Sequence, residues 1–351
     1  MYSESDIDAA VAAGALTPQA AEAFRTHVAE MRAAPAVDQE SFRFLTGFND
    51  IFVSIAAVLM LVALGWLGNT VRLLAQPDAP SPLAGLAVAA GGWGLAEYFT
   101  RQRRMALPSI LLLLAFTGGL GVGTMMLLSA LLGVVPEGND RAMALLIAAA
   151  AAVTAGGVWL HWRRFQVPIT IAAGAATLAA LSIGLILAAV PPVIDYLSPL
   201  IFLAGIAVFA LAMRWDMSDR TRTTRRSDVA FWLHLLAAPM LVHPIFSAFG
   251  PRTELGAPVV IALYILLGFV ALAIDRRALM VSALAYVLYA IGHLIDQGGG
   301  KGGSFGITAL VIGSALLLLS AFWTVARAWV VDRLPERMAD RLPMIDRRAV
   351  A

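Results

Sequence analysis

Polar side chains recur along one apolar segment, residues 279–296, at the spacing of an α-helix. They are Ser282, Tyr286, Tyr289, His293 and Asp296, separated by four, three, four and three residues. At about 100° per residue they share one helix face. Hydrogen-bonding groups in hydrocarbon lack partners, so this face meets either a water-filled cavity or the polar groups of neighbouring helices. His293 and Asp296 are close enough to pair, and a histidine beside a carboxylate is a plausible proton acceptor.

A second polar segment holds two histidines and two prolines. Pro239 and Pro244 each remove a backbone donor, which predicts a broken helix beside His243. His234 lies nine residues before His243 and points to the opposite face, so the two do not bind one metal from a straight helix. His243 and His293 either line a shared polar cavity or pack separately. These alternatives stay open at the level of the sequence.

Other ionisable groups have simpler interpretations. Glu97 stands four residues before Arg101, which predicts an ion pair at the membrane edge; the alternative is a transport carboxylate. Asp50 opens an apolar segment, where a carboxylate caps a helix N-terminus. The loop 297–304 reads as a flexible linker, with an anion-binding nest around Lys301 as the alternative. It is not a phosphate loop, because a glycine follows the lysine and no strand precedes it.

Composition excludes several classes of function. The chain has no cysteine, which rules out disulfides, thiolate catalysis and Cys-ligated zinc. No serine–histidine–aspartate order, zinc-binding helix or dinucleotide motif is present, so we predict no catalytic residue, no metal and no cofactor. The formal net charge of +2 gives no reason to expect nucleic acid as a partner. An enzyme that acts on lipid is therefore the least favoured class of function.

The solvent of most of this chain is predicted to be lipid. Hydrophobic residues make up 60% of it, charged residues only 14%, and the mean hydropathy is +0.80. Ten apolar segments are long enough, or nearly so, to cross a bilayer as helices. They lie at about 49–68, 83–100, 107–135, 141–160, 167–190, 197–213, 228–249, 256–274, 279–296 and 305–329. The third contains Thr117-Gly118-Gly119, which suggests a kink or a re-entrant break.

Arginine fixes the expected orientation. Of 25 basic residues, 21 fall in the termini and in alternate gaps between the apolar segments, and four fall in the remaining gaps. Lysine and arginine are retained on the cytoplasmic side, so both termini are predicted to be cytoplasmic. The start of the chain lacks a basic region, so no cleaved signal peptide is expected. The Ala-, Leu- and Arg-rich composition is typical of bacteria and favours an inner membrane.

Three regions are expected. Residues 1–48 form a cytoplasmic helical hairpin and interfacial linker, 49–330 a transmembrane bundle, and 331–351 an Arg-rich cytoplasmic tail. Within the first region, Thr17-Pro18 predicts a helix start, and two apolar stripes suggest that residues 1–34 dock on a protein partner or on a second copy. The alternative is a weakly ordered tail.

The N-terminal pattern carries a resemblance. Asp6-Ile7-Asp8, then Ala13 to Ala21 with Gly14 and Thr17-Pro18, then Phe42 to Phe52, resemble a family of uncharacterised bacterial polytopic membrane proteins over the first third of the chain. In that family a short helix–glycine–helix hairpin precedes many spans. The resemblance implies the fold and brings no activity or site residue.

The fold expected from these observations is all-α: a polytopic bundle of about ten transmembrane helices behind a small soluble hairpin. The favoured function is a permease-like transporter or exporter. Its candidate polar-cavity residues are His243, His293, Asp296, Tyr286, Tyr289, Ser282 and His234. The alternative is a non-catalytic scaffold or accessory subunit that docks partners through the hairpin.

Overall fold

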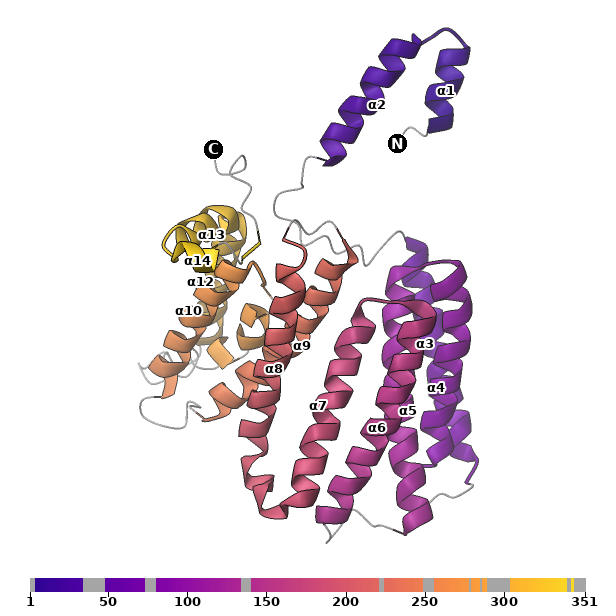
Figure 1. Cartoon of the computed structure of the whole chain (residues 1–351), viewed down its shortest axis with the longest axis vertical. Coiled ribbons are helices and arrows are strands. Elements are labelled where there is room, and N and C mark those ends of the chain that lie inside the picture. Colours follow the sequence, from indigo (N-terminus) through magenta and orange to yellow (C-terminus); the bar gives the residue numbers. More distant parts are fainter. Residues whose placement is uncertain are drawn as a thin grey trace. The chain divides into compact units, whose positions relative to one another are not determined.

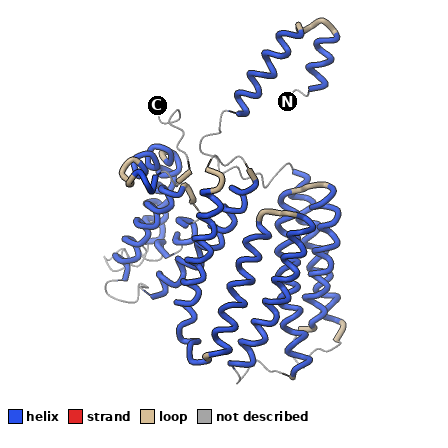
Figure 2. The backbone as a smooth tube through the Cα atoms, viewed as in Figure 1, coloured by secondary structure: helices blue, strands red, loops and turns tan. Residues whose placement is uncertain are grey.

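The computed structural model describes most of the chain, and every regular element in the described part is helical (Figure 2). The described residues are 4–33, 48–72, 80–133, 140–220, 224–248, 256–277, 279–284, 286–288, 304–339 and 342–343. They belong to two compact units, and the boundary between these units in the sequence falls between Phe42 and Arg43. The all-α prediction is confirmed for the described residues.

The smaller unit contains two helices, α1 (Glu4–Ala12) and α2 (Pro18–Ala33). Gly14 adopts a left-handed φ of 72° in the turn after α1, a conformation that glycine accepts without strain. Thr17 caps α2, because its Oγ1 accepts a hydrogen bond from the Ala20 amide at 3.1 Å, and Pro18 follows at the first helical position. Ile7 and Ala21 are buried.

The larger unit is a succession of long helices (Figure 1). They are α3 (Phe48–Thr70), α4 (Pro82–Ala96), α5 (Ala106–Leu132), α6 (Asp140–Phe165), α7 (Ile169–Ala189), α8 (Leu197–Met217), α9 (Arg225–Ala248), α10 (Gly256–Ile274), α12 (Ser304–Ala321), α13 (Trp323–Val331) and α14 (Glu336–Ala339). A π-helix, η1 (Glu97–Gln102), continues α4, and a 3₁₀-helix, η2 (Pro191–Tyr196), precedes α8. Consecutive helices pack together, most extensively α4 on α5, α6 on α7 and α8 on α9.

Six described helices are long and apolar enough to cross a membrane: α3, α5, α6, α7, α9 and the α8 segment from Val193. The bent pair Ile312–Ala321 and Trp323–Val331 gives a seventh if it is one span. Shorter apolar helices cover Val259–Ile274 and Leu279–Leu288. These helices indicate an integral, multi-pass membrane protein.

The last predicted span, 305–329, is wrong as a single helix. α12 ends at Ala321, and α13 leaves it at an angle of 75°. Neither proline nor glycine stands at the bend. Trp323 instead donates a hydrogen bond from Nε1 to Asp275 Oδ1 at 2.7 Å, which ties the start of α13 to the end of α10. A tertiary contact therefore outweighs the continuous apolar pattern.

The re-entrant break suggested at Thr117-Gly118-Gly119 and the broken helix predicted beside His243 are absent. α5 is continuous through Thr117-Gly118-Gly119, and α9 is continuous through Pro239 and Pro244. Each proline removes a single backbone donor, and the rest of the hydrogen-bond ladder with close neighbours keeps the helix intact. The close neighbour of this part of α9 is α8, whose Gly205 lies against Met240.

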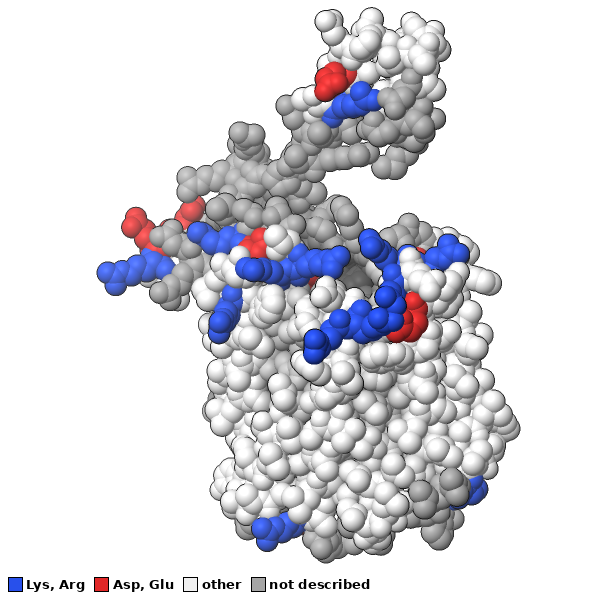
Figure 3. All heavy atoms as spheres, turned by 45° about the vertical axis from the view of Figure 1, so that its right-hand side comes forward, with Lys and Arg blue, Asp and Glu red and all other residues white. Residues whose placement is uncertain are grey.

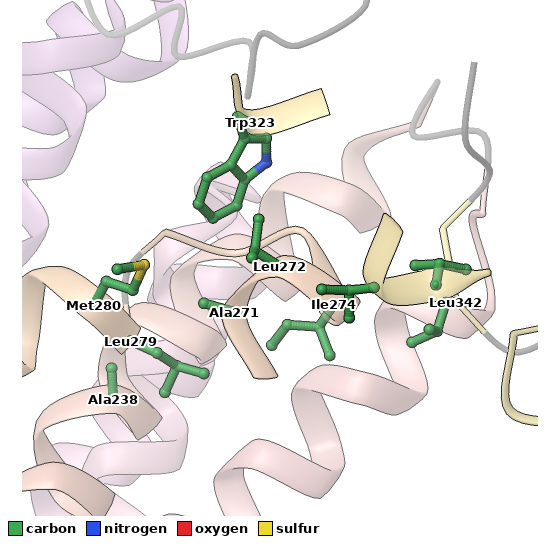
Figure 4. Close-up of a cluster of buried hydrophobic side chains, with 10 residues drawn as sticks. Ala238, Ala271, Leu272, Ile274, Leu279, Met280, Trp323 and Leu342 are labelled. Atoms are coloured by element: carbon green, nitrogen blue, oxygen red, sulfur yellow. The ribbon is translucent and has the colours of Figure 1, made fainter. Parts of the chain in front are cut away.

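The core near α13 joins the C-terminal elements to the bundle. Trp323, Leu272 and Leu279 are buried there with Ala238 of α9 (Figure 4). Leu342 packs into the same cluster beside Ile274. The end of α10 therefore lies between α9 and the C-terminal helices, and this position brings its charged residues into the interior.

Basic side chains gather at one end of the long helices, and few lie at the opposite end (Figure 3). The described helix ends explain this distribution. Arg101, Arg163–Arg164, Arg214, Arg225–Arg226 and Arg276–Arg277 stand where successive helices end or begin on one side. Arg72 and Arg141 stand at the other ends of their helices.

Candidate functional site

Three ionisable side chains form a buried cluster, here called the charged triad: Asp216, His234 and Arg276. His234 donates from Nε2 to Asp216 Oδ2 at 2.9 Å. Arg276 donates from Nε to the same oxygen at 3.2 Å and from Nη2 to Oδ1. Asp216 and Arg276 are each 2% exposed, and His234 is fully buried. Because the carboxylate accepts all three bonds, it organises the cluster.

Each member of the charged triad comes from a different element. Asp216 lies in the last turn of α8, His234 in the first half of α9, and Arg276 just after α10. Asp275 takes a left-handed φ of 58°, and the Arg276 amide returns to the Ala271 carbonyl at 2.9 Å. This tight helix end turns the Arg276 side chain towards α8 and α9.

Aromatic rings surround the charged triad. Phe209 meets the His234 ring edge-on at 5.2 Å between centroids, and the Arg276 guanidinium lies 5.9 Å from the Phe231 ring. Apolar walls strengthen charged hydrogen bonds and make each member costly to remove. The charged triad therefore holds α8, α9 and the end of α10 together.

A second polar contact joins α9 to the segment after α10. His243 Nδ1 shares a hydrogen bond with the Tyr286 hydroxyl, and Phe246 lies 5.0 Å from the Tyr286 ring. His234 and His243 thus have separate partners, as their opposite helix faces predict. Among the described residues, no group of three His, Cys, Asp or Glu has the geometry of a metal site.

The structure describes only part of the predicted polar stripe. Tyr286 meets His243, and Ser282 is half-buried one turn earlier. Tyr289, His293 and Asp296 lie outside the described residues. The predicted meeting of His243 with His293 therefore stays a prediction.

Asp275, next to Arg276, extends polar contacts to the C-terminal helices. Besides the bond from Trp323, it lies 3.7 Å from Arg327 Nη1 of α13. Arg327 also donates from Nη2 to the Pro343 carbonyl at 2.7 Å, and Arg220 donates from Nε to the Leu342 carbonyl at 3.0 Å. The sequence did not indicate these contacts, because Arg220 and Arg327 are far from their partners along the chain.

The predicted pair of Glu97 with Arg101 is confirmed at 3.5 Å. A stronger partner was not predicted: Arg164 of α6 donates from Nε and Nη2 to the two Glu97 oxygens at 2.8 and 2.9 Å. Asp50 stands in the first turn of α3, as expected for a residue that favours a helix N-terminus. It is nevertheless buried, with 2% of its surface exposed.

His161 lies near the end of α6 among aromatic rings. It is fully buried, and the rings of Trp93, Phe116 and Phe165 surround it at 4.5–5.8 Å between centroids. Thr170 Oγ1 lies 3.4 Å from its Nδ1. α6 continues to Phe165, beyond the segment end expected at residue 160, so this histidine lies within the helix.

No family model, no curated protein and no solved structure matches the chain. The resemblance of its N-terminal third to uncharacterised polytopic membrane proteins therefore stays a prediction.

Proposed function

We propose that this protein is a permease-like transporter or exporter in which α9 is the gating helix. The observation that supports this most is that α9 carries a histidine contact towards each of its ends. His234 bonds Asp216, which also binds Arg276, while His243 bonds Tyr286. Of the two histidines, His234 is buried inside the bundle, where an ionisable group is costly and usually serves function.

The spacing of these contacts fits alternating access. His234 and His243 are nine residues apart, which places them about 14 Å apart along the helix axis. Pro239 lies between them and Pro244 follows directly, so the local ladder lacks two donors and bends at lower cost. Release of one histidine contact while the other persists would open one end of the interface at a time.

A proton is the favoured coupling ion. His243 pairs with a tyrosine hydroxyl, and an imidazole nitrogen and a hydroxyl can each donate or accept the proton of such a hydrogen bond. In the predicted ten-span bundle, His293 and Asp296 extend this polar route on the same side of the membrane. The transported substrate would cross beside α9.

Tyr286→Phe is expected to open the His243 end, because it removes the hydroxyl and leaves the ring. A hydrogen bond contributes about 1 kcal/mol, so the open population should rise roughly fivefold. The chain has no cysteine, so single thiols can be introduced without background. Val242→Cys and Ala230→Cys place a thiol at a fully buried position near each end of the gate. The rate of labelling by a small water-soluble maleimide in proteoliposomes reports opening.

The matched control is Tyr264→Phe, the same substitution on α10 at a hydroxyl with no hydrogen-bond partner among the described residues. We expect Tyr286→Phe to speed labelling at residue 242 and to slow it or leave it unchanged at residue 230. Faster labelling at both positions, or the same change in Tyr264→Phe, would show general loosening and end the gating proposal. A second experiment then imposes a pH gradient across the proteoliposomes and follows proton uptake by the fluorescence of pyranine trapped inside.

The orientation belongs to the same proposal. The basic ends of α6, α8 and α10 and the basic start of α9 gather on one side of the bundle, and the positive-inside rule places that side in the cytoplasm. Both termini are then cytoplasmic in a bundle of ten spans. An inner bacterial membrane fits this arrangement.

A scaffold role is the second candidate, and the small unit favours it. The unit buries Ile7 and Ala21 but leaves Phe24 of α2 43% exposed and Leu16, in the turn between the helices, 36% exposed. Apolar side chains presented to water by a separate hairpin suit docking of a protein partner or a second copy. Deletion of residues 1–34 should then remove a stoichiometric partner on copurification while leaving the labelling rates of α9 unchanged. An unchanged set of copurifying proteins would contradict this role.

A further inference from the structure

Two basic helix ends that are distant in sequence meet at one place on the bundle, here called the basic corner. One is the end of η1 and the residues after it, with Arg101, Arg103 and Arg104; the other is the end of α6, with Arg163 and Arg164. The bonds from Arg164 to Glu97 join them across 67 residues of sequence. Of the five arginines on these two helix ends, only Arg101 and Arg164 bind Glu97, so the basic corner keeps an excess of positive charge.

The remaining contacts of the basic corner position guanidinium groups without neutralising them. Arg103 donates from Nε and Nη2 to the Tyr98 hydroxyl at 3.1 and 2.9 Å. Arg163 lies over the Trp159 ring, 4.9 Å from its centroid. Both partners are uncharged aromatics, which fix the direction of a cation and leave its charge for another ligand.

The backbone also makes the basic corner distinctive. Six residues of π-helix at the end of α4 widen the turn that carries Glu97, Tyr98 and Arg101, and such turns are frequent at functional sites. Arg104 then adopts a left-handed φ of 54°, which reverses the chain into α5. A non-glycine residue in this conformation is uncommon, so tertiary contacts must hold the turn.

An apolar surface adjoins the charged groups. On α6, Trp159 and Leu160 are 55% and 53% exposed, each four residues before one of the two arginines, and Tyr98 is 42% exposed on η1. In Figure 3 the band of basic side chains lies above a broad surface without charge. A ligand that suits both parts has an anionic head and an apolar body, which a free phosphate ion lacks.

We propose that the basic corner is a binding site for an anionic phospholipid. Its phosphate accepts hydrogen bonds from Arg103 and Arg163, and its acyl chains lie along Trp159 and Leu160. Arg101 and Arg164 remain with Glu97 and hold the two helix ends together. The site does not depend on transport by the protein.

The test is a titration of the full-length chain with phosphatidylglycerol, followed by native mass spectrometry from detergent. The double variant Arg103→Gln with Arg163→Gln removes two charges and spares the Glu97 pairs. We expect its dissociation constant for phosphatidylglycerol to rise roughly thirtyfold. The matched control is Arg214→Gln with Arg226→Gln, two exposed arginines of α8 and α9, for which we expect less than a threefold change.

Three results would overturn the proposal. One is equal loss of affinity in both double variants, which indicates general surface charge. Another is equal affinity of the unmodified chain for phosphatidylglycerol and phosphatidylcholine. The third is complete displacement of the lipid by millimolar inorganic phosphate, which assigns the site to the free anion. An unchanged unfolding midpoint of the variant confirms that its fold is intact.

Discussion

Replacement of Asp216 by leucine is expected to lower the free energy of unfolding by about 3 kcal/mol or more. The carboxylate accepts hydrogen bonds from His234 and twice from Arg276, and all three side chains are buried. Loss of the carboxylate leaves a guanidinium in an apolar site where its desolvation is no longer offset. The unfolding midpoint, followed by the fluorescence of the eight tryptophans in lipid nanodiscs, should fall accordingly.

The control for this change is Asp195→Leu. Asp195 is an exposed acid in η2, before the start of α8, so the same substitution removes a charge from solvent. Exposed acids contribute little to stability, and we expect a change within about 0.5 kcal/mol. A midpoint for Asp216→Leu that matches this control would show that the charged triad does not hold the helices together.

A triple variant separates stability from function. Asp216→Leu, His234→Phe and Arg276→Met replace the charged triad by apolar side chains, and Phe at position 234 can keep the ring contact with Phe209. Such replacements are often neutral or stabilising, so the midpoint should recover. Under the proposed function, this stable protein should not alternate between labelling at residues 230 and 242. Normal alternation in the triple variant would assign the charged triad to stability alone.

Hydropathy predicted most helices closely. The segment expected at 167–190 forms α7 at Ile169–Ala189, and the segment expected at 256–274 forms α10 with the same bounds. A helix in lipid must satisfy its own backbone groups, so a long apolar run has few alternatives. Basic residues at the ends then mark its limits. The count of ten spans stays a prediction, because six described helices are long and apolar enough to cross a membrane and others are shorter.

The charged triad was harder to predict, because its members are 18 and 60 residues apart in the pairs that bond. In the sequence, Arg276 lies in one of the basic gaps that indicate orientation, and nothing near it in the chain marks it as a partner of Asp216. One signal was present: Asp216 stands in the last turn of α8, where the helix dipole disfavours a negative charge. An acid in that position needs a cationic partner, and the basic residue pairs at neighbouring helix ends were the candidates.

The bend at Phe322 had no local signal. The sequence from α12 into α13 stays apolar and contains no proline or glycine at the break. The cause is the tertiary bond from Trp323 to Asp275, together with the approach of Arg327 to the same carboxylate. Contacts of this kind depend on how helices are arranged, which a single apolar pattern does not determine.

The second large effect is expected from substitution of the glycines of α5. The packing of these glycines also explains why Thr117-Gly118-Gly119 does not interrupt the helix. A Cβ at Gly119 would lie 2.6 Å from the Gly85 carbonyl oxygen and 2.8 Å from the Ala89 amide nitrogen of α4. A Cβ at Gly118 would have no atom within 4 Å. The two glycines are adjacent, yet only Gly119 faces the close contact between α4 and α5.

Gly119→Ala should therefore destabilise the protein by about 1–3 kcal/mol, because backbone atoms cannot move aside as a flexible side chain can. Gly118→Ala should stabilise it by about 0.5–1 kcal/mol, because alanine restricts the unfolded chain and favours the helix. The two variants add the same methyl group one residue apart, so composition and hydropathy are identical. The sign of the midpoint shift alone distinguishes them.

The same contact extends to Gly85 and Gly123, since a Cβ at Gly85 would lie 2.6 Å from the Gly123 amide nitrogen. Gly123→Ala should thus resemble Gly119→Ala in the direction of its shift. A stabilising shift in both variants would mean that α4 and α5 separate at little cost. In that case the turn that carries η1 would not be fixed against α5, and the basic corner would lose the rigid support on which its arrangement of arginines depends.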